Sequence, residues 1–314
     1  MQERLQRMLD RIRDTHREIL GDNLTGIYVH GSIAFGCFRW ESGDIDYLAV
    51  VREPVPLRER IELVETLLRL DRDAPPKGIE MSVVLERHCR DFVHPTPFDF
   101  HFSNMHKEAA RRDPAAFCGW MHGEDEDLAA HFSVVREAGI PLCGPEARDV
   151  FAPVPREAFL DSVRSDIRGA CGMTEDPPVY RVLTLCRVLA YLREGRFLSK
   201  EQGGEWGIRN LPVEYARMIR KLTDKYRDRG FGPHATGGTD MPDGSSLFVI
   251  SNASIPPILR REDTSDAIKT GIRRTGNGQP DAPPPPFRRS WLISRRADAS
   301  SSRRRSSGAR TAFR

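Results

Sequence analysis

The chain has 314 residues, is 39% hydrophobic and carries a formal net charge of +3. This composition supports one or two ordinary hydrophobic cores, and no apolar run approaches the length that crosses a bilayer. The first ten residues are charged throughout and lack the apolar stretch of a signal peptide, so we expect a cytoplasmic protein with no membrane partner. The six cysteines show no Cys-x-x-Cys spacing, which favours free thiols.

The charge is unevenly distributed along the chain. Residues 231–314 contain fourteen Arg and Lys against seven Asp and Glu, which leaves residues 1–230 with a net charge of −4. The C-terminal segment is rich in Gly, Pro, Ser and Arg, and this composition predicts a disordered basic tail. The acidic remainder suits a polycationic substrate, and we expect nucleic acid as a partner, if at all, only through the tail arginines.

The first half of the chain alternates between helical and extended patterns. Apolar residues at helical spacing predict amphipathic helices over residues 3–20 and 57–70. Short β-branched or aromatic runs predict strands at 27–30 and 47–51, joined by a glycine-bearing turn, and at 79–85. A further helix is predicted over 120–135. Acidic residues at 124–127 would then lie near its start, where they favour the helix dipole; attraction of a cationic ligand is the alternative.

The second half of the chain has a helical pattern. Turn residues at 143–145 and alternating prolines at 151–155 indicate a boundary. Beyond it, helices are predicted over 156–170, 179–194 and 213–227. The predicted fold class is therefore α+β, with a mixed sheet and helices in residues 1–150, an all-α bundle in 151–230 and the tail in 231–314.

Two acidic residues stand at the head of the second strand. Asp44 and Asp46 are two positions apart, so an extended backbone directs both carboxylates to one face of the sheet. A divalent cation is the common way to keep two such groups ionised, and Mg²⁺ fits best because it takes oxygen ligands together with substrate phosphates. Gly31 and Ser32 offer bare backbone amides and a hydroxyl donor for a polyphosphate. Taken alone, an Asp-x-Asp pair more often caps a turn.

The order of these motifs resembles the polymerase-β-like nucleotidyltransferases. Gly31-Ser32, eleven intervening residues and Asp44-Ile45-Asp46 match the motif of that superfamily. From about residue 24 to about 226, the order of features is similar to that of the aminoglycoside 3''- and 9-adenylyltransferases. The further matching features are the strand Ile79-Glu80-Met81-Ser82-Val83-Val84, Leu142-Cys143-Gly144-Pro145, Leu183-Thr184-Leu185-Cys186-Arg187, Ser199-Lys200 and Glu205-Trp206.

The resemblance implies roles for individual residues. Glu80, which on sequence alone could be a charge at a strand end, is the expected third carboxylate and proton acceptor, and with Asp44 and Asp46 it forms the expected metal site. Arg187 and Lys200 are the expected contacts to the phosphates of ATP. The implied reaction is Mg²⁺-dependent transfer of AMP from ATP to a hydroxyl of a small aminoglycoside-type acceptor, of the spectinomycin or streptomycin class, as in antibiotic resistance.

The acceptor is less well determined by the sequence. The tryptophan that supports streptomycin in the resembled enzymes aligns with Met105, and only Glu175 and Asp176 remain of the acidic residues ahead of the second helical segment. These departures speak against streptomycin and leave spectinomycin or another hydroxyl compound. The alternatives are a toxin-antitoxin nucleotidyltransferase that modifies protein or RNA, and a non-catalytic nucleotide-binding relative.

Overall fold

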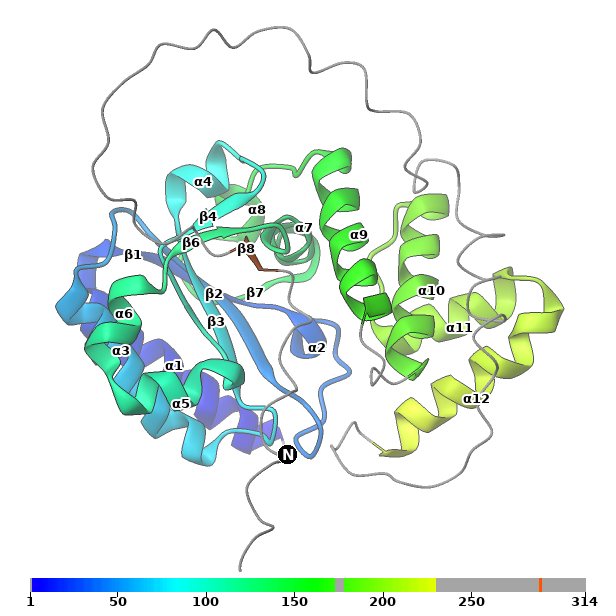
Figure 1. Ribbon diagram of the computed structural model, residues 1–314, viewed down its shortest axis with the longest axis horizontal. Coiled ribbons are helices and arrows are strands. Elements are labelled where there is room, and N and C mark those ends of the chain that lie inside the picture. Colours follow the sequence, from blue (N-terminus) through cyan, green and yellow to red (C-terminus); the bar gives the residue numbers. More distant parts are fainter. Residues whose placement is uncertain (1, 173–177, 230–287, 290–314) are drawn as a thin grey trace, which may run out of the picture.

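The structure is a computed structural model that describes residues 2–172, 178–229 and 288–289. Strands alternate with helices up to residue 143, and residues 156–229 are mainly helical where the structure describes them (Figure 1). We call residues 2–150 the sheet region and residues 156–229, without 173–177, the helical region. The tail predicted over 231–314 lies outside the described residues, apart from positions 288 and 289, and the division into domains stays a prediction.

The sheet region is built on a five-stranded mixed sheet, as predicted. Its strands stand in the order β5-β3-β2-β1-β7, and β2 and β3 are parallel whereas the other neighbours are antiparallel. The strands are β1 (Leu24–Val29), β2 (Ile45–Val51), β3 (Ile79–Leu85), β5 (Phe100–Phe102) and β7 (Ile140–Cys143). A second, three-stranded sheet consists of β4 (Thr96–Phe98), β6 (Gly123–Asp125) and β8 (Arg288–Arg289).

Helices cover both faces of the five-stranded sheet, which explains why its central strands are apolar on successive residues. Ile27 and Tyr47 point into a core shared with one set of helices, while Tyr28 and Leu48 point into a core on the opposite face. The first set is α1 (Gln2–Leu20), α3 (Leu57–Leu70), α5 (Lys107–Arg112) and α6 (Pro114–Trp120); the second is α7 (Leu128–Ala138) and α8 (Ala147–Val150) (Figure 1).

Short helical turns complete the sheet region. The connection from β1 to β2 contains the one-turn helix α2 (Gly31–Ala34), so the predicted turn between these strands is longer and partly helical. Another short helix, α4 (Glu86–Arg90), follows β3 directly. The remaining turns are 3-10 helices at Gly21–Asn23, Asp71–Asp73 and Asn104–His106.

The helical region has its own core. Its helices are α9 (Arg156–Gly172), α10 (Pro178–Glu194), α11 (Lys200–Asn210) and α12 (Val213–Arg229). The last three pack around the fully buried Trp206, together with Leu183 and Ile219. Helix α9 lies against α7 of the sheet region and joins the two parts. Across the described residues, no helix combines the length and the apolarity needed to span a bilayer.

Two helical segments differ from the sequence-based prediction. The helix predicted over 120–135 is divided: α6 ends at Trp120, β6 follows, and α7 begins only at Leu128. Helix α11 was not predicted, because Gly203, Gly204 and Gly207 lower its intrinsic helix propensity. Tertiary packing overrides that preference.

Candidate active site

The parallel pairing of β2 and β3 places two predicted site residues side by side. Asp46 on β2 and Glu80 on β3 are direct partners in the strand register. Direct neighbours on adjacent strands point to the same face of the sheet, so the two carboxylates share one face. Asp44 lies just before β2, and its charge acts on both of the others. Asp44, Asp46 and Glu80 each keep part of their surface exposed to solvent.

The Gly31 backbone lies directly against the Asp46 carboxylate. The amide N–H of His30 donates to the carbonyl oxygen of Asp46 at 2.9 Å, which fixes the chain beside β2. Gly31 then turns with a positive φ of +62°, and a Cβ placed there would lie 2.2 Å from Asp46 Oδ2. Only glycine combines this conformation with this approach. The turn therefore presents bare backbone next to a carboxylate.

Ser32 has an unused polar group at this turn. Its Oγ atom is buried and has no hydrogen-bond partner among the described residues. A buried hydroxyl of this kind usually reflects a ligand or water that completes its hydrogen bonding. Its place in the turn suits a phosphate oxygen, which accepts hydrogen bonds from hydroxyl and amide donors.

The carboxylates repel one another in this setting. Loss of surrounding water raises the pKa of Asp46 well above its ordinary value, and the charge of Asp44 raises it further, whereas Lys200 and Lys77 oppose the rise. The pKa of Glu80 is also raised well above its ordinary value, first by burial and then by Asp46 and Asp44. The site thus has an excess of negative charge that a cation would relieve.

Lys200 of the helical region is close enough to this site for its charge to act on Asp46, and Arg187 lies near Lys200. Lys200 is the first residue of α11, directly after the N-cap Ser199, and its Nζ lies 4.7 Å from the centre of the Tyr180 ring. Burial and the neighbouring Arg187 lower the pKa of Lys200, while Asp44 and Asp166 raise it. The Nε of Arg187 donates to the carbonyl oxygen of Leu198 at 2.8 Å. Lys200 therefore lies among charges from both regions.

Three acidic residues that the sequence analysis did not assign to the site adjoin it. Asp125 on β6 and Asp127 at the start of α7 are both buried, and their charges contribute to the raised pKa of Glu80. Asp166 on α9 influences Lys200 and accepts hydrogen bonds from the Tyr180 hydroxyl at 3.4 Å. For Asp125 and Asp127 the signal in the sequence was the acidic run 124–127, for which attraction of a cationic ligand was only the alternative to a role at a helix start; Asp166 had no signal in the sequence.

The residues present suit Mg²⁺ by their chemistry. Within the described ranges, no group of three or more His, Cys, Asp or Glu is arranged to hold a metal ion. Mg²⁺ is commonly held by one or two carboxylates plus the phosphates of a substrate, and Asp44 with Asp46 supplies that number. The mutual repulsion of these carboxylates and the unpartnered Ser32 hydroxyl fit a cation bound together with a polyphosphate. The metal site formed by Asp44, Asp46 and Glu80 stays a prediction.

Comparison with solved structures identifies the fold. A spectinomycin adenyltransferase from Enterococcus, solved with ATP and spectinomycin, superimposes with a TM-score of 0.64 at 17% identity, covering 79% of this chain and 98% of that one. The likeness shows that this chain, with its mixed sheet followed by a helical region, has the fold of that adenyltransferase.

Comparison with sequences finds similar proteins among the aminoglycoside adenylyltransferases. Residues 149–235 match the family model described as aminoglycoside adenylyltransferase, C-terminal domain. An aminoglycoside (3'') (9) adenylyltransferase of Klebsiella pneumoniae is 24% identical over 222 residues, 66% of this chain and 79% of the relative. A spectinomycin 9-adenylyltransferase of Enterococcus faecalis is 21% identical over 229 residues, 69% and 86% of the two chains. The chain is thus similar to the aminoglycoside (3'')(9) adenylyltransferases, and the match to the family model covers its helical region.

Proposed function

We propose that the protein transfers AMP from ATP to a hydroxyl group of a small aminoglycoside-type acceptor, with Mg²⁺ as cofactor. The observation that carries the proposal is the direct pairing of Asp46 with Glu80, beside a Gly31 backbone that leaves no space for a side chain. The named relatives are aminoglycoside or spectinomycin adenylyltransferases, which supports the same reaction class.

Glu80 is the proposed proton acceptor. The acceptor hydroxyl oxygen attacks the α-phosphorus of ATP, the bond to the β-phosphate oxygen breaks, and pyrophosphate leaves. The hydroxyl proton passes to the Glu80 carboxylate. Burial and the neighbouring aspartates raise the pKa of Glu80, which makes its ionised form a stronger base than an ordinary glutamate.

The remaining residues hold the nucleotide. Asp44 and Asp46 would hold Mg²⁺, which supplies charge neutralisation at the phosphates. The Gly31 and Ser32 turn donates hydrogen bonds to phosphate oxygens, and Arg187 and Lys200 balance the charge that develops on pyrophosphate. Catalysis in this scheme rests on positioning and electrostatics, as is usual for phosphoryl transfer.

The charge of the site supports a cationic acceptor. Asp125 and Asp127 are buried close enough to Glu80 to raise its pKa, and burial together with Asp125 raises the pKa of Asp127 itself well above its ordinary value. An acceptor that carries amino groups would relieve this repulsion, and aminoglycosides carry such groups. Met105 is exposed and takes the place of the tryptophan that supports streptomycin in the resembled enzymes. Because this tryptophan is missing, we propose spectinomycin ahead of streptomycin as the acceptor.

An acceptor panel tests the proposal. Purified protein is incubated with ATP labelled in the α-phosphate, with or without Mg²⁺, and with spectinomycin, streptomycin, other aminoglycosides, tRNA or protein. We expect label on at least one of the small acceptors, only with Mg²⁺. Label on tRNA or protein alone would assign the toxin-like alternative, and ATP binding without transfer to any acceptor would assign the non-catalytic one.

A further inference from the structure

The loop between α2 and β2 contacts the helical region on both sides of Lys200. Residues 36–43 form this loop, and Asp44 follows it directly. The Cys37 thiol lies near the Ser199 side chain, immediately before Lys200: burial raises the pKa of the thiol, and Ser199 opposes that rise. Arg39 lies 3.9 Å from Glu201, immediately after Lys200. Ser199 and Glu201, which flank Lys200, are thus neighbours of the loop that leads to Asp44.

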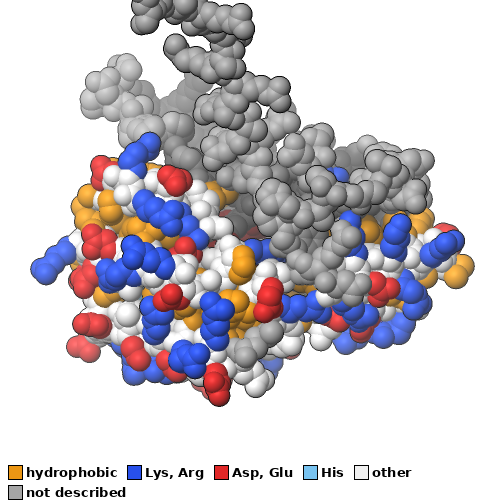
Figure 2. All heavy atoms as spheres, turned by 90° about the horizontal axis from the view of Figure 1, so that it is seen from below, with side chains coloured by type: hydrophobic (Ala, Val, Ile, Leu, Met, Phe, Trp, Pro, Cys, Tyr) orange, Lys and Arg blue, Asp and Glu red, His pale blue; other side chains and the backbone are white. Residues whose placement is uncertain are grey.

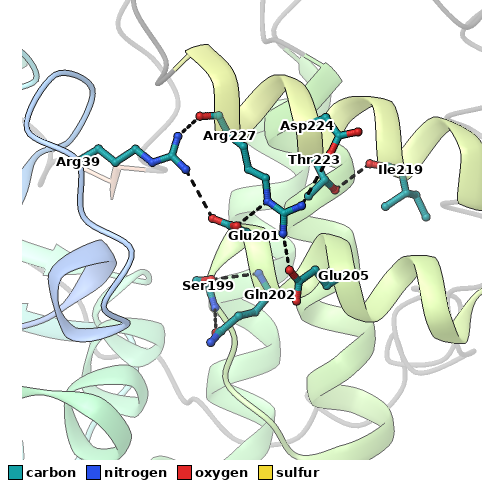
Figure 3. Close-up of polar contacts among 9 residues, drawn as sticks. All are labelled: Arg39, Ser199, Glu201, Gln202, Glu205, Ile219, Thr223, Asp224 and Arg227. Carbon is teal, nitrogen blue, oxygen red and sulfur yellow. Dashed lines mark hydrogen bonds and ion pairs between the residues drawn. The ribbon is translucent and has the colours of Figure 1, made fainter.

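The contact at Arg39 is part of a larger polar network, which we call the clasp: Arg39, Glu201 and Arg227 (Figure 3). One carboxylate oxygen of Glu201 accepts a hydrogen bond from Arg227 Nε at 2.5 Å, and the other faces Arg39 Nη2. Arg39 Nη1 also donates to the backbone carbonyl oxygen of Arg227. Glu201 is therefore shared between an arginine of the sheet region and an arginine of the helical region.

The charged groups of the clasp are partly exposed to solvent. The side chains of Arg39 and Glu201 retain 40% and 26% exposure, so water screens their attraction. Ion pairs of this kind contribute little to stability on their own. Several contacts that act on one short segment can nevertheless fix its position, because the backbone of Glu201 continues directly from Lys200.

We propose that Arg39 and Glu201 are positioning residues, which hold the start of α11 against the 36–43 loop and thereby place Lys200 at the nucleotide phosphates. This inference rests on the proposed function and deepens it. The clasp couples the two sets of groups that the reaction needs: the carboxylates that follow the loop, and the cation at the start of α11. Neither Arg39 nor Glu201 is assigned contact with the substrates.

Direct measurement of ATP affinity tests the clasp without depending on the acceptor. Isothermal titration with a non-hydrolysable ATP analogue and Mg²⁺ is carried out on the full chain and on the variants Arg39→Ala and Glu201→Gln. We expect each variant to weaken binding about three- to tenfold, with an unchanged melting temperature. Arg39→Lys should restore part of the affinity. The difference from wild type should shrink at about 0.5 M NaCl, because salt screens exposed charge pairs.

Two further variants separate positioning from a general structural effect. Glu205 lies on α11 like Glu201 and also binds Arg227, but it is not part of the contact with Arg39. The variant Glu205→Gln should therefore keep the wild-type affinity for ATP. In a Lys200→Ala background, Arg39→Ala should have no further effect on ATP affinity, since it acts through Lys200.

The outcomes distinguish this inference from the proposed function. Unchanged ATP affinity in both Arg39→Ala and Glu201→Gln would overturn the clasp and leave the proposed reaction intact. An equal loss in the Glu205→Gln control, or a full additional loss in the Lys200→Ala background, would also overturn it. Failure of the wild-type protein to bind ATP would overturn the proposed function, and the clasp with it.

Discussion

Gly31 is the residue at which backbone conformation and site chemistry meet. Its φ of +62° favours glycine, and the absence of a side chain lets the backbone approach the Asp46 carboxylate. The two requirements are separable in this chain, because Gly195 has a φ of +68° but open space where a Cβ would be. Gly195 therefore provides a control for backbone strain alone.

We predict that Gly31→Ala lowers AMP transfer at least about a hundredfold, because the new methyl group displaces the Asp46 carboxylate from its working position. Gly195→Ala should cost about 1 to 2 kcal/mol of folding free energy from the same backbone strain and leave transfer near the wild-type rate. Transfer assays and urea denaturation of the two variants measure these effects. Equal transfer by Gly31→Ala and wild type would contradict the assigned role of the turn.

The raised pKa of Glu80 predicts how the stability of the folded protein depends on pH. A carboxyl group whose pKa is raised by folding binds more protons in the folded state, so its contribution to stability falls as the pH rises from about 4.5 through the raised value. Glu80→Gln removes this loss. At pH 8 without Mg²⁺, the variant should melt a few degrees above wild type, and the difference should disappear toward pH 4.5.

Glu86 supplies the matched control, because Arg90 and Thr25 lower its pKa by hydrogen bonding to the ionised form. Its ionised form is therefore stabilising, and Glu86→Gln should melt below wild type at pH 8. Thermal denaturation of both variants between pH 4.5 and 8 measures the two curves. If the melting temperature of Glu80→Gln follows that of wild type at a constant difference over this pH range, the pKa of Glu80 is not raised in the folded protein.

At the scale of elements, α11 shows how glycine serves helix packing. A Cβ on Gly204 would lie 2.2 Å from the Thr223 hydroxyl of α12, and one on Gly203 would lie 2.6 Å from Cγ of Arg187 on α10. These glycines let three helices approach closely, and they set Arg187 beside the start of α11. The same glycines lower the helix propensity of α11.

We predict that Gly204→Ala destabilises the protein by about 1 to 3 kcal/mol, because overpacking outweighs the gain in helix propensity. Gly119→Ala is the matched substitution, since Gly119 is also helical but a Cβ there would meet no neighbour within 4 Å. It should stabilise the protein by up to about 1 kcal/mol. Chemical denaturation of both variants decides the point, and a stabilised Gly204→Ala would contradict the packing account.

Much of the framework of the site could be predicted because it depends on local pattern. The spacing of Asp44 and Asp46 before an apolar run places them at a strand head, and the same strand logic locates Glu80. The parallel register that pairs Asp46 with Glu80 depends on the arrangement of the strands in the sheet. Strand patterns do not predict that arrangement, so placing Glu80 beside Asp46 depended on the family resemblance. Asp125, Asp127 and Asp166 escaped prediction because only tertiary packing brings β6, α7 and α9 toward Glu80 and Lys200.

At the scale of the whole molecule, the candidate site belongs to two regions of the chain. The carboxylates come from the sheet region, and Arg187 and Lys200 come from the helical region. Acidic and basic side chains intermingle over the face seen in Figure 2, rather than forming a surface of one sign there. Negative charge is instead gathered around Glu80, where Asp46, Asp44, Asp125 and Asp127 all raise the pKa of its carboxyl group, and this supports the proposed cationic acceptor.

The proposed AMP transfer to a small acceptor depends on the paired carboxylates of β2 and β3. The most direct test is mass spectrometry of spectinomycin after incubation with ATP and Mg²⁺, using wild type, Asp46→Asn and Glu80→Gln. We predict an acceptor that gains one AMP group with the wild-type protein, and rates lower by about 10² to 10⁴ with either folded variant. Transfer by either variant at the wild-type rate would contradict the roles proposed for Asp46 and Glu80.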